Sequence, residues 1–99
     1  MRIGTVIGRV TLAKTAESLR GARWLIVSPF ARQQFQDPSH LPAVSREASL
    51  VVYDDLGGSV GQTIGFIEGR EAAMPFDQPT PIDALDAALV DDIFYSPLK

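Results

Sequence analysis

The most informative stretch of this chain is Asp54-Asp55-Leu56-Gly57-Gly58-Ser59-Val60-Gly61-Gln62. Three glycines within five positions, set between two apolar runs, indicate a backbone that turns tightly or approaches another backbone closely. A phosphate-binding loop would need a lysine and then a serine or threonine directly after its last glycine, at the start of a helix. Here Gln62-Thr63-Ile64 follows the last glycine and continues into strand-like sequence. The phosphate-binding interpretation therefore fails.

The composition indicates a single globular domain over residues 1–99. Hydrophobic residues make up 45% of the chain, and the net charge is −3. Because a domain of this size has only a modest core, we expect oligomerisation to add stability. A nucleic-acid partner would require a basic stripe, which the acidic balance argues against. The chain has no cysteine, which excludes disulfides, thiolate nucleophiles and zinc–thiolate sites.

Apolar and β-branched runs predict four strands, at residues 2–12, 23–27, 49–53 and 63–67. The longest irregular stretch, residues 30–47, is expected to contain a helical turn near Arg32–Gln36. The N-terminus enters a β-like run at once, without the apolar segment of a signal peptide, and no apolar stretch is long enough to span a membrane. We therefore expect no membrane partner.

The segment at residues 84–94 is ambiguous on pattern alone. Thr80-Pro81-Ile82-Asp83 resembles a helix start, and apolar residues then recur at helical spacing, which favours a helix. The same residues also alternate between apolar and acidic positions, as they would in a strand.

Four motifs, in this order along the chain, resemble those of one known family. They are the strand Arg2-Ile3-Gly4-Thr5-Val6-Ile7-Gly8-Arg9-Val10, then Leu19-Arg20-Gly21, the glycine-rich stretch at 54–62, and Pro81-Ile82-Asp83 before a strand ending in Asp92-Ile93. Together they resemble the pentameric vertex proteins of bacterial microcompartments, the small shell family of carboxysomes and ethanolamine-utilising compartments. The resemblance covers nearly the whole chain apart from residues 30–47.

This resemblance implies an all-β fold, a small five-stranded OB-like barrel with a short helical turn, in which residues 84–94 form a strand. It implies a structural shell protein that assembles as a cyclic homopentamer, caps the vertices of a cytoplasmic microcompartment, and has hexameric shell proteins as partners. The residues that it implies at the subunit interface or the fivefold axis are Asp54, Gly57, Gly58, Ser59, Val60, Gly61, Gln62, Pro81, Ile82 and Asp83. Two of them depart from the family pattern, since Ser59 replaces a glycine and Gln62 replaces an acid.

Catalytic and metal-binding interpretations are weaker. Asp54 and Asp55 are adjacent on a strand and point to opposite faces, so they do not form a carboxyl dyad. The acidic residues near the C-terminus lack the spacing of a calcium loop, and a solvated face or a capping role is expected for Asp83, Asp86, Asp91 and Asp92. His40, the one histidine, is expected on the surface. We therefore expect no catalytic residue, no metal site and no cofactor.

Two other function classes remain as alternatives at this point. The first is an OB-like binding module for oligonucleotide or oligosaccharide, in which Trp24 would stack a base. Core or interface packing is the favoured role for Trp24, because the chain is acidic and has few aromatic residues. The second alternative is a small acid–base enzyme. A pentameric mass in solution would favour the shell protein over both.

Overall fold

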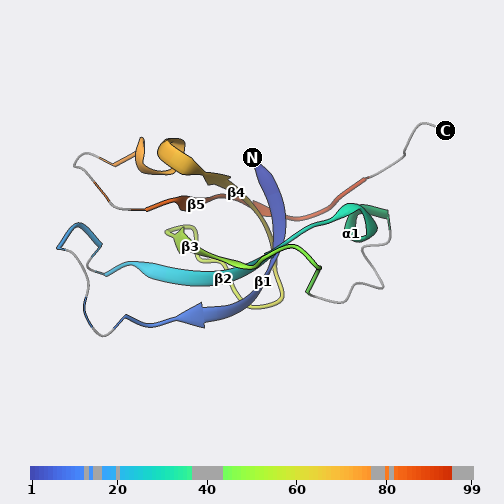
Figure 1. The fold of residues 1–99 in the computed structure, drawn as a ribbon, viewed down its shortest axis with the longest axis horizontal. Coiled ribbons are helices and arrows are strands. Elements are labelled where there is room, and N and C mark those ends of the chain that lie inside the picture. Colours follow the sequence, from blue (N-terminus) through green and yellow to red (C-terminus); the bar gives the residue numbers. More distant parts are fainter. Residues whose placement is uncertain are drawn as a thin grey trace.

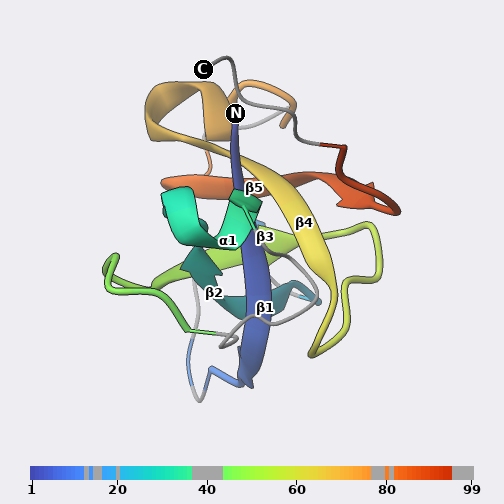
Figure 2. The ribbon, with the colours of Figure 1, turned by 90° about the vertical axis from the view of Figure 1, so that its right-hand side faces the viewer.

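Five strands of the described residues close into a barrel (Figures 1 and 2). The computed structural model describes residues 1–12, 14, 17–19, 21–36, 44–76, 80 and 82–94. The strands are β1 (Arg2–Val10), β2 (Arg23–Pro29), β3 (Leu50–Asp54), β4 (Thr63–Glu68) and β5 (Ala84–Val90). Around the barrel they follow the order β1-β2-β3-β5-β4, and β4 pairs with β1 to close it. Closure leaves the barrel without free sheet edges.

One strand pair differs from the others in direction. β3 and β5 are parallel, with Tyr53 beside Leu85, whereas every other pairing of the barrel is antiparallel. Three short helices complete the described elements: η1 (Glu17–Leu19), α1 (Arg32–Gln36) and η3 (Gly69–Ala73). In Figure 1, α1 and η3 lie toward opposite ends of the molecule.

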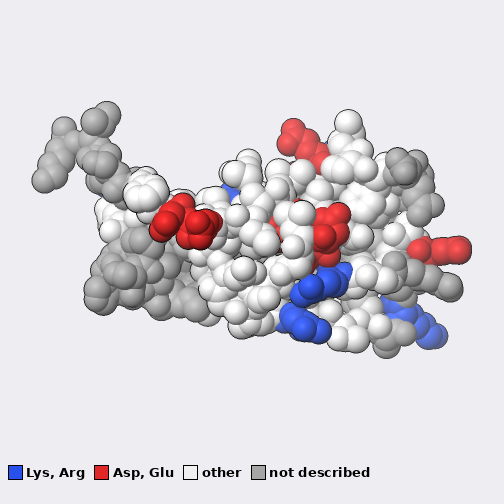
Figure 3. Space-filling view, turned by 180° about the vertical axis from the view of Figure 1, so that it is seen from behind, with Lys and Arg blue, Asp and Glu red and all other residues white. Residues whose placement is uncertain are grey.

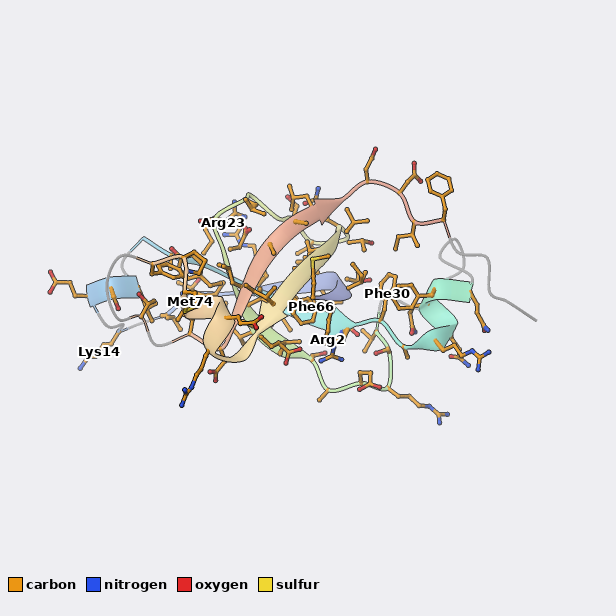
Figure 4. All side chains as sticks on the ribbon, turned by 90° about the horizontal axis from the view of Figure 1, so that it is seen from above. Arg2, Lys14, Arg23, Phe30, Phe66 and Met74 are labelled. Atoms are coloured by element: carbon orange, nitrogen blue, oxygen red, sulfur yellow. The ribbon has the colours of Figure 1, made fainter. Side chains whose placement is uncertain are left out.

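The barrel interior is filled by alternate side chains of the strands. This core cluster consists of Val6, Leu25, Val27, Val52, Ile64, Phe66 and Ala84. Residues two apart on a strand share a face, so the period-two spacing of Leu25 and Val27 sends both side chains inward. Phe66 is the largest of the fully buried side chains. The guanidinium carbon of Arg2 lies 5.7 Å from the centre of the Phe66 ring, and the two side chains are adjacent in Figure 4.

A second cluster lies on the outer face of the barrel, which we call the outer cluster. Its buried members are Leu19, Ala72, Ile82 and Leu85, with Trp24, Tyr53, Ile67, Ala73 and Phe76 packed against them. The Tyr53 ring contacts Trp24 and Phe76 edge-to-face, at centroid distances of 5.5 and 5.0 Å. Trp24 is therefore a packing residue, as its sequence context favours. Because η3 contributes Ala72, this short helix covers part of the barrel wall.

The structure confirms the four predicted strands, the helical turn at Arg32–Gln36 and the strand interpretation of the last segment. The helical spacing of apolar residues near residues 84–94 is misleading because β5 contributes side chains to both clusters. Ala84 enters the core cluster, and Leu85 enters the outer cluster. The sequence did not predict η3. His40 and much of the long irregular stretch lie outside the described residues. Within the described part, no helix is long and apolar enough to cross a membrane.

Candidate functional site

The glycine loop, residues 54–62, begins with a buried carboxylate that organises its first half. Asp54 ends β3 and is 2% exposed. Its Oδ1 accepts a hydrogen bond from the Leu56 N–H at 3.0 Å, and its Oδ2 accepts one from the Gly58 N–H at 2.8 Å. An aspartate that accepts hydrogen bonds from backbone N–H groups two and four residues ahead stabilises a turn. Asp55 is exposed, which confirms that these two neighbours face apart.

Arg23 braces the same turn from the neighbouring strand β2. It lies opposite Asp54 in the β2–β3 register. Its Nη2 donates to the Gly58 carbonyl oxygen at 3.0 Å, and its Nε lies 3.7 Å from the Asp54 Oδ2. The Arg23 side chain is 45% exposed, so solvent screens much of this ion pair. The guanidinium, labelled in Figure 4, therefore contributes mainly by its directed bond to the loop backbone.

The three glycines of the loop serve different purposes. Gly57 and Gly61 have φ angles of 85° and 94°, in the left-handed region that favours glycine, and a Cβ at Gly61 would meet nothing within 4 Å. A Cβ at Gly58 would lie 2.8 Å from the Leu25 Cδ1 and 3.3 Å from the Asp86 Oδ2. The close approach predicted for this loop therefore exists at Gly58, and it is made to residues of the same chain.

The second half of the loop is a turn tied to β1. The Gln62 N–H donates to the Ser59 carbonyl oxygen at 3.0 Å, and the Gln62 Oε1 accepts from the Ser59 N–H at 2.8 Å. Gly61 and Gln62 then exchange hydrogen bonds with Val6, both at 2.8 Å. These bonds extend the β1–β4 pairing into the loop and hold its tip against the barrel.

Asp86 corrects the expectation of a solvated acidic face on the last segment. Its side chain is 2% exposed, and it lies opposite Phe66 of the core cluster. Asp83, Asp91 and Asp92 are exposed, as expected. The difference follows from strand alternation, because Asp86 shares a face of β5 with the core residue Ala84.

The carboxyl groups of Asp54 and Asp86 form a pair at this end of the barrel interior. The parallel register of Tyr53 with Leu85 places the next residues of β3 and β5, Asp54 and Asp86, side by side. The Asp86 Oδ1 accepts from the Ala88 N–H at 3.2 Å. Its Oδ2 has no hydrogen-bond partner among the described residues. Burial first, and the neighbouring Asp54 second, raise the pKa of Asp86 from 3.8 to about 7.

The other predicted interface residues fall in different places. Ser59, Val60, Gly61 and Gln62 are exposed on the loop. Ile82 is buried in the outer cluster, and Asp83 is exposed just before β5. The loop follows β3, whereas these two residues precede the parallel strand β5, so the structure does not bring the two groups together. Pro81 lies outside the described residues.

The rest of the described surface shows little that suggests ligand chemistry. No group of three histidine, cysteine or acidic side chains is placed to hold a metal ion in the described part of the chain. One pocket of about 220 Å³, at the β1–β2 end of the barrel, is lined by residues 9–12, 19 and 21–24. On the face in Figure 3, acidic and basic side chains are interspersed among the described residues, without a continuous basic stripe. A stripe is what tracking a phosphate backbone requires.

Comparison with known families identifies the chain. Residues 1–91 match the family described as ethanolamine utilisation protein EutN/carboxysome. The chain belongs to this family. A search of curated proteins returned no significant match, so the assignment rests on the family match and on solved structures. The EutN/carboxysome family is one of microcompartment shell proteins, and this chain is therefore a shell protein of closed-barrel fold.

Solved structures of this kind share the fold over almost the whole chain. A pentameric microcompartment shell protein, GrpN from Rhodospirillum rubrum, is 25% identical, with a TM-score of 0.77 over 97% of this chain and 100% of its own. CcmL from Gloeobacter violaceus is 20% identical, with a TM-score of 0.78 over 96% and 90% of the two chains. EutN from Escherichia coli is 19% identical, with a TM-score of 0.74 over 96% and 90%.

One loop residue differs from the pattern of the EutN/carboxysome family. Gln62 stands where the family pattern has an acid, yet its amide oxygen accepts the Ser59 N–H and closes the turn. An amide oxygen accepts a hydrogen bond as a carboxylate oxygen does, without its charge. The loop of this shell protein therefore has a closed turn with glutamine at this position. The family match does not favour the alternative of an oligonucleotide- or oligosaccharide-binding module.

Proposed function

We propose that this chain forms a cyclic homopentamer that caps the vertices of a bacterial microcompartment shell. The observation that carries the proposal is the end-to-end match, over 97% of this chain and all of the other, to a pentameric microcompartment shell protein. A flat sheet of hexagonal units cannot close on itself, and pentagonal units at the vertices supply the missing curvature. The partners of the pentamer in this role are hexameric shell proteins, and the role itself requires no catalysis.

A cyclic pentamer uses one heterologous interface, in which two different surface patches of the subunit match. We assign one of these patches to the glycine loop. Two of its side chains, Leu56 and Val60, are apolar and are 46% and 61% exposed. Exposed apolar groups held on a rigid backbone are suited to an interface, because little order is lost when they are covered.

Within this proposal the loop residues divide into two roles. Asp54 and Gly58 are buried in their own subunit and set the shape of the loop. The residues available to contact a neighbouring subunit or the fivefold axis are Leu56, Gly57, Ser59, Val60, Gly61 and Gln62. Asp83 is exposed and remains a candidate for the opposing patch. Ile82 supports it from within the outer cluster.

A matched pair of substitutions tests the loop assignment. Val60 and Val44 are both exposed valines, at 61% and 53%, but Val44 lies near α1 rather than in the loop. Because a buried unpaired carboxylate is costly, Val60→Asp should shift the chain from pentamer toward monomer in size exclusion with light scattering. Val44→Asp should keep the mass of the parent. If the Val60→Asp variant has the same oligomer mass as the parent protein, the loop is not a subunit interface.

The vertex role is tested by assembling shells. Hexameric shell proteins from the same microcompartment would be co-expressed with and without this chain, and the particles would be examined by electron microscopy. We expect closed, faceted particles only when the chain is present, with the chain incorporated in them. Equally closed particles in its absence would refute the vertex role, even if the chain is pentameric.

A further inference from the structure

Two carboxyl groups are buried side by side beneath the glycine loop, an arrangement that shell assembly alone does not require. Asp54 and Asp86 are each 2% exposed and lie side by side on parallel strands. The Asp54 Oδ2 and the Asp86 Oδ2 both lie within 4 Å of the point where a Gly58 Cβ would stand. Two ionised carboxylates in so dry a position would repel each other strongly.

We propose that Asp54 and Asp86 share one proton, and that this proton latches the glycine loop onto the barrel. The unpartnered Oδ2 of Asp86 is the observation that points to it. Two carboxyl oxygens are both acceptors, so they can bond to each other only when one of them carries a hydrogen. A shared proton gives the buried oxygen a partner and removes the repulsion in one step.

The surroundings decide which of the two groups holds the proton. Asp54 accepts from the N–H groups of Leu56 and Gly58 and has Arg23 at 3.7 Å, and all three stabilise its ionised form. Asp86 has only the Ala88 N–H, at 3.2 Å. The proton therefore belongs on the Asp86 Oδ2, which donates it toward Asp54 and leaves the Asp54 carboxylate free to hold the turn.

Other charged groups on the neighbouring elements do not replace this proton. On β4 the one ionisable side chain is Glu68, which is exposed and paired with Arg2 at 2.9 Å. On η3, Arg70 and Glu71 are exposed. Asp55, beside the pair, adds a further negative charge that favours the protonated form of Asp86. Among the described residues, Arg23 is the one basic group close to the pair, and its guanidinium is already bonded to the Gly58 carbonyl oxygen.

The latch weakens when the proton is lost to solvent base. Both carboxylates are then charged, and the repulsion is relieved when Asp86 reaches water as the loop lifts from Leu25. Because the pKa of this carboxyl group is 3.8 in its ordinary state and about 7 when Asp86 is buried, the latch weakens progressively between about pH 4 and pH 7. If the loop is the subunit contact proposed above, assembly is then favoured below neutral pH. That consequence rests on the proposed function, whereas the latch itself does not.

Carboxyl-carbon NMR of the intact protein, labelled at aspartate, tests the latch directly. We expect the carboxyl-carbon chemical shift of Asp86 to titrate near neutral pH. The chemical shift of the Asp54 carboxyl carbon should change over the same pH range. The Asp86→Asn variant should lose this step, and Asp92→Asn, at an exposed position, should keep it. Titration of Asp86 below about pH 5, the range of ordinary carboxyl groups, would overturn the proposal. The titration of the parent protein does not depend on its oligomeric state.

Hydrogen exchange then tests the effect on the loop. Between pH 5.5 and 7.5 the protection factor of the Gly58 amide should fall about twentyfold, as expected when opening exposes a group whose pKa is raised by burial. The fall should be absent in Asp86→Asn, whose side-chain amide can donate to Asp54 at any pH. Equal protection at both pH values in the parent would show that the shared proton does not latch the loop. A change of oligomer mass without this fall would separate assembly from the latch.

Discussion

Adding a single methyl group at Gly58 tests the packing beneath the loop most sharply. The Cβ of alanine would stand 2.8 Å from the Leu25 Cδ1, whereas ordinary carbon contacts are about 3.5–4.0 Å. Leu25 is fully buried and cannot yield freely. Overpacking of this kind costs about 1–3 kcal/mol. For a domain of this size, each kcal/mol lowers Tm by roughly 4–8 °C, so Gly58→Ala should melt about 5–20 °C below the parent.

Gly61→Ala is the matched control. Its cost comes from the φ angle of 94° and not from packing, because nothing lies within 4 Å of the added atom. A left-handed conformation costs an alanine about 1–2 kcal/mol, so the two single variants could melt alike. Leu25→Val separates them, since valine has no Cδ atom. The double variant Gly58→Ala/Leu25→Val should lose at least about 0.5 kcal/mol less unfolding free energy than the sum of the losses in its two single variants. In the double variant Gly61→Ala/Leu25→Val the two losses should simply add.

The assay is denaturant unfolding of these variants and the parent at one protein concentration, because the stability of an oligomer depends on concentration. The oligomer mass of each variant is measured alongside. If Gly58→Ala and Leu25→Val combine additively, the Gly58–Leu25 contact does not determine the loop conformation, and the reasoning fails.

Three further predictions concern charged groups. Arg23→Ala should cost about 1 kcal/mol and deprotect the Gly58 amide in hydrogen exchange, because it removes the bond to the loop carbonyl; unchanged exchange there would contradict the bracing role. Arg2→Ala should cost under about 1 kcal/mol in the same unfolding assay, since its ion pair with Glu68 is exposed on both sides. The pKa of Asp86 is raised from 3.8 to about 7 on folding, so the folded state holds a proton that the unfolded state has lost. The unfolding free energy should therefore fall between about pH 4 and pH 7, by up to about 4 kcal/mol relative to Asp86→Asn, and parallel pH profiles of the two proteins would refute it.

Much of the barrel could be predicted from local pattern. The strands at 23–27, 49–53 and 63–67 carry most of the apolar side chains of the core, and their residue types favour extended backbone. β5 could not be predicted this way. Side chains on both faces of this strand are packed, some inside the barrel and some against its outer wall. Odd- and even-numbered positions are therefore both partly apolar, and the apolar residues match the spacing of a helix by coincidence. The alternation of apolar and acidic positions allowed a strand, but only the order of the motifs along the chain decided in favour of one.

The constrained backbone of the glycine loop could be predicted from the sequence, but the contacts that constrain it could not. The glycine spacing indicated a constrained loop, and the structure supplies the reasons, with two left-handed glycines and one packed against Leu25. The carboxyl pair could not be foreseen, because it depends on the parallel β3–β5 register, which no local pattern encodes. Once Ala84 is known to face the core, Asp86 must face it too, and that period-two relation was the signal available in the sequence.

The central claim is the fivefold assembly, and native mass spectrometry of the unmodified chain tests it most directly. The measurement counts subunits without reference to shape. We expect one dominant species at about five times the 10.7 kDa mass of the chain, persisting on dilution. A dominant monomer, dimer or hexamer across the same concentrations would contradict the account.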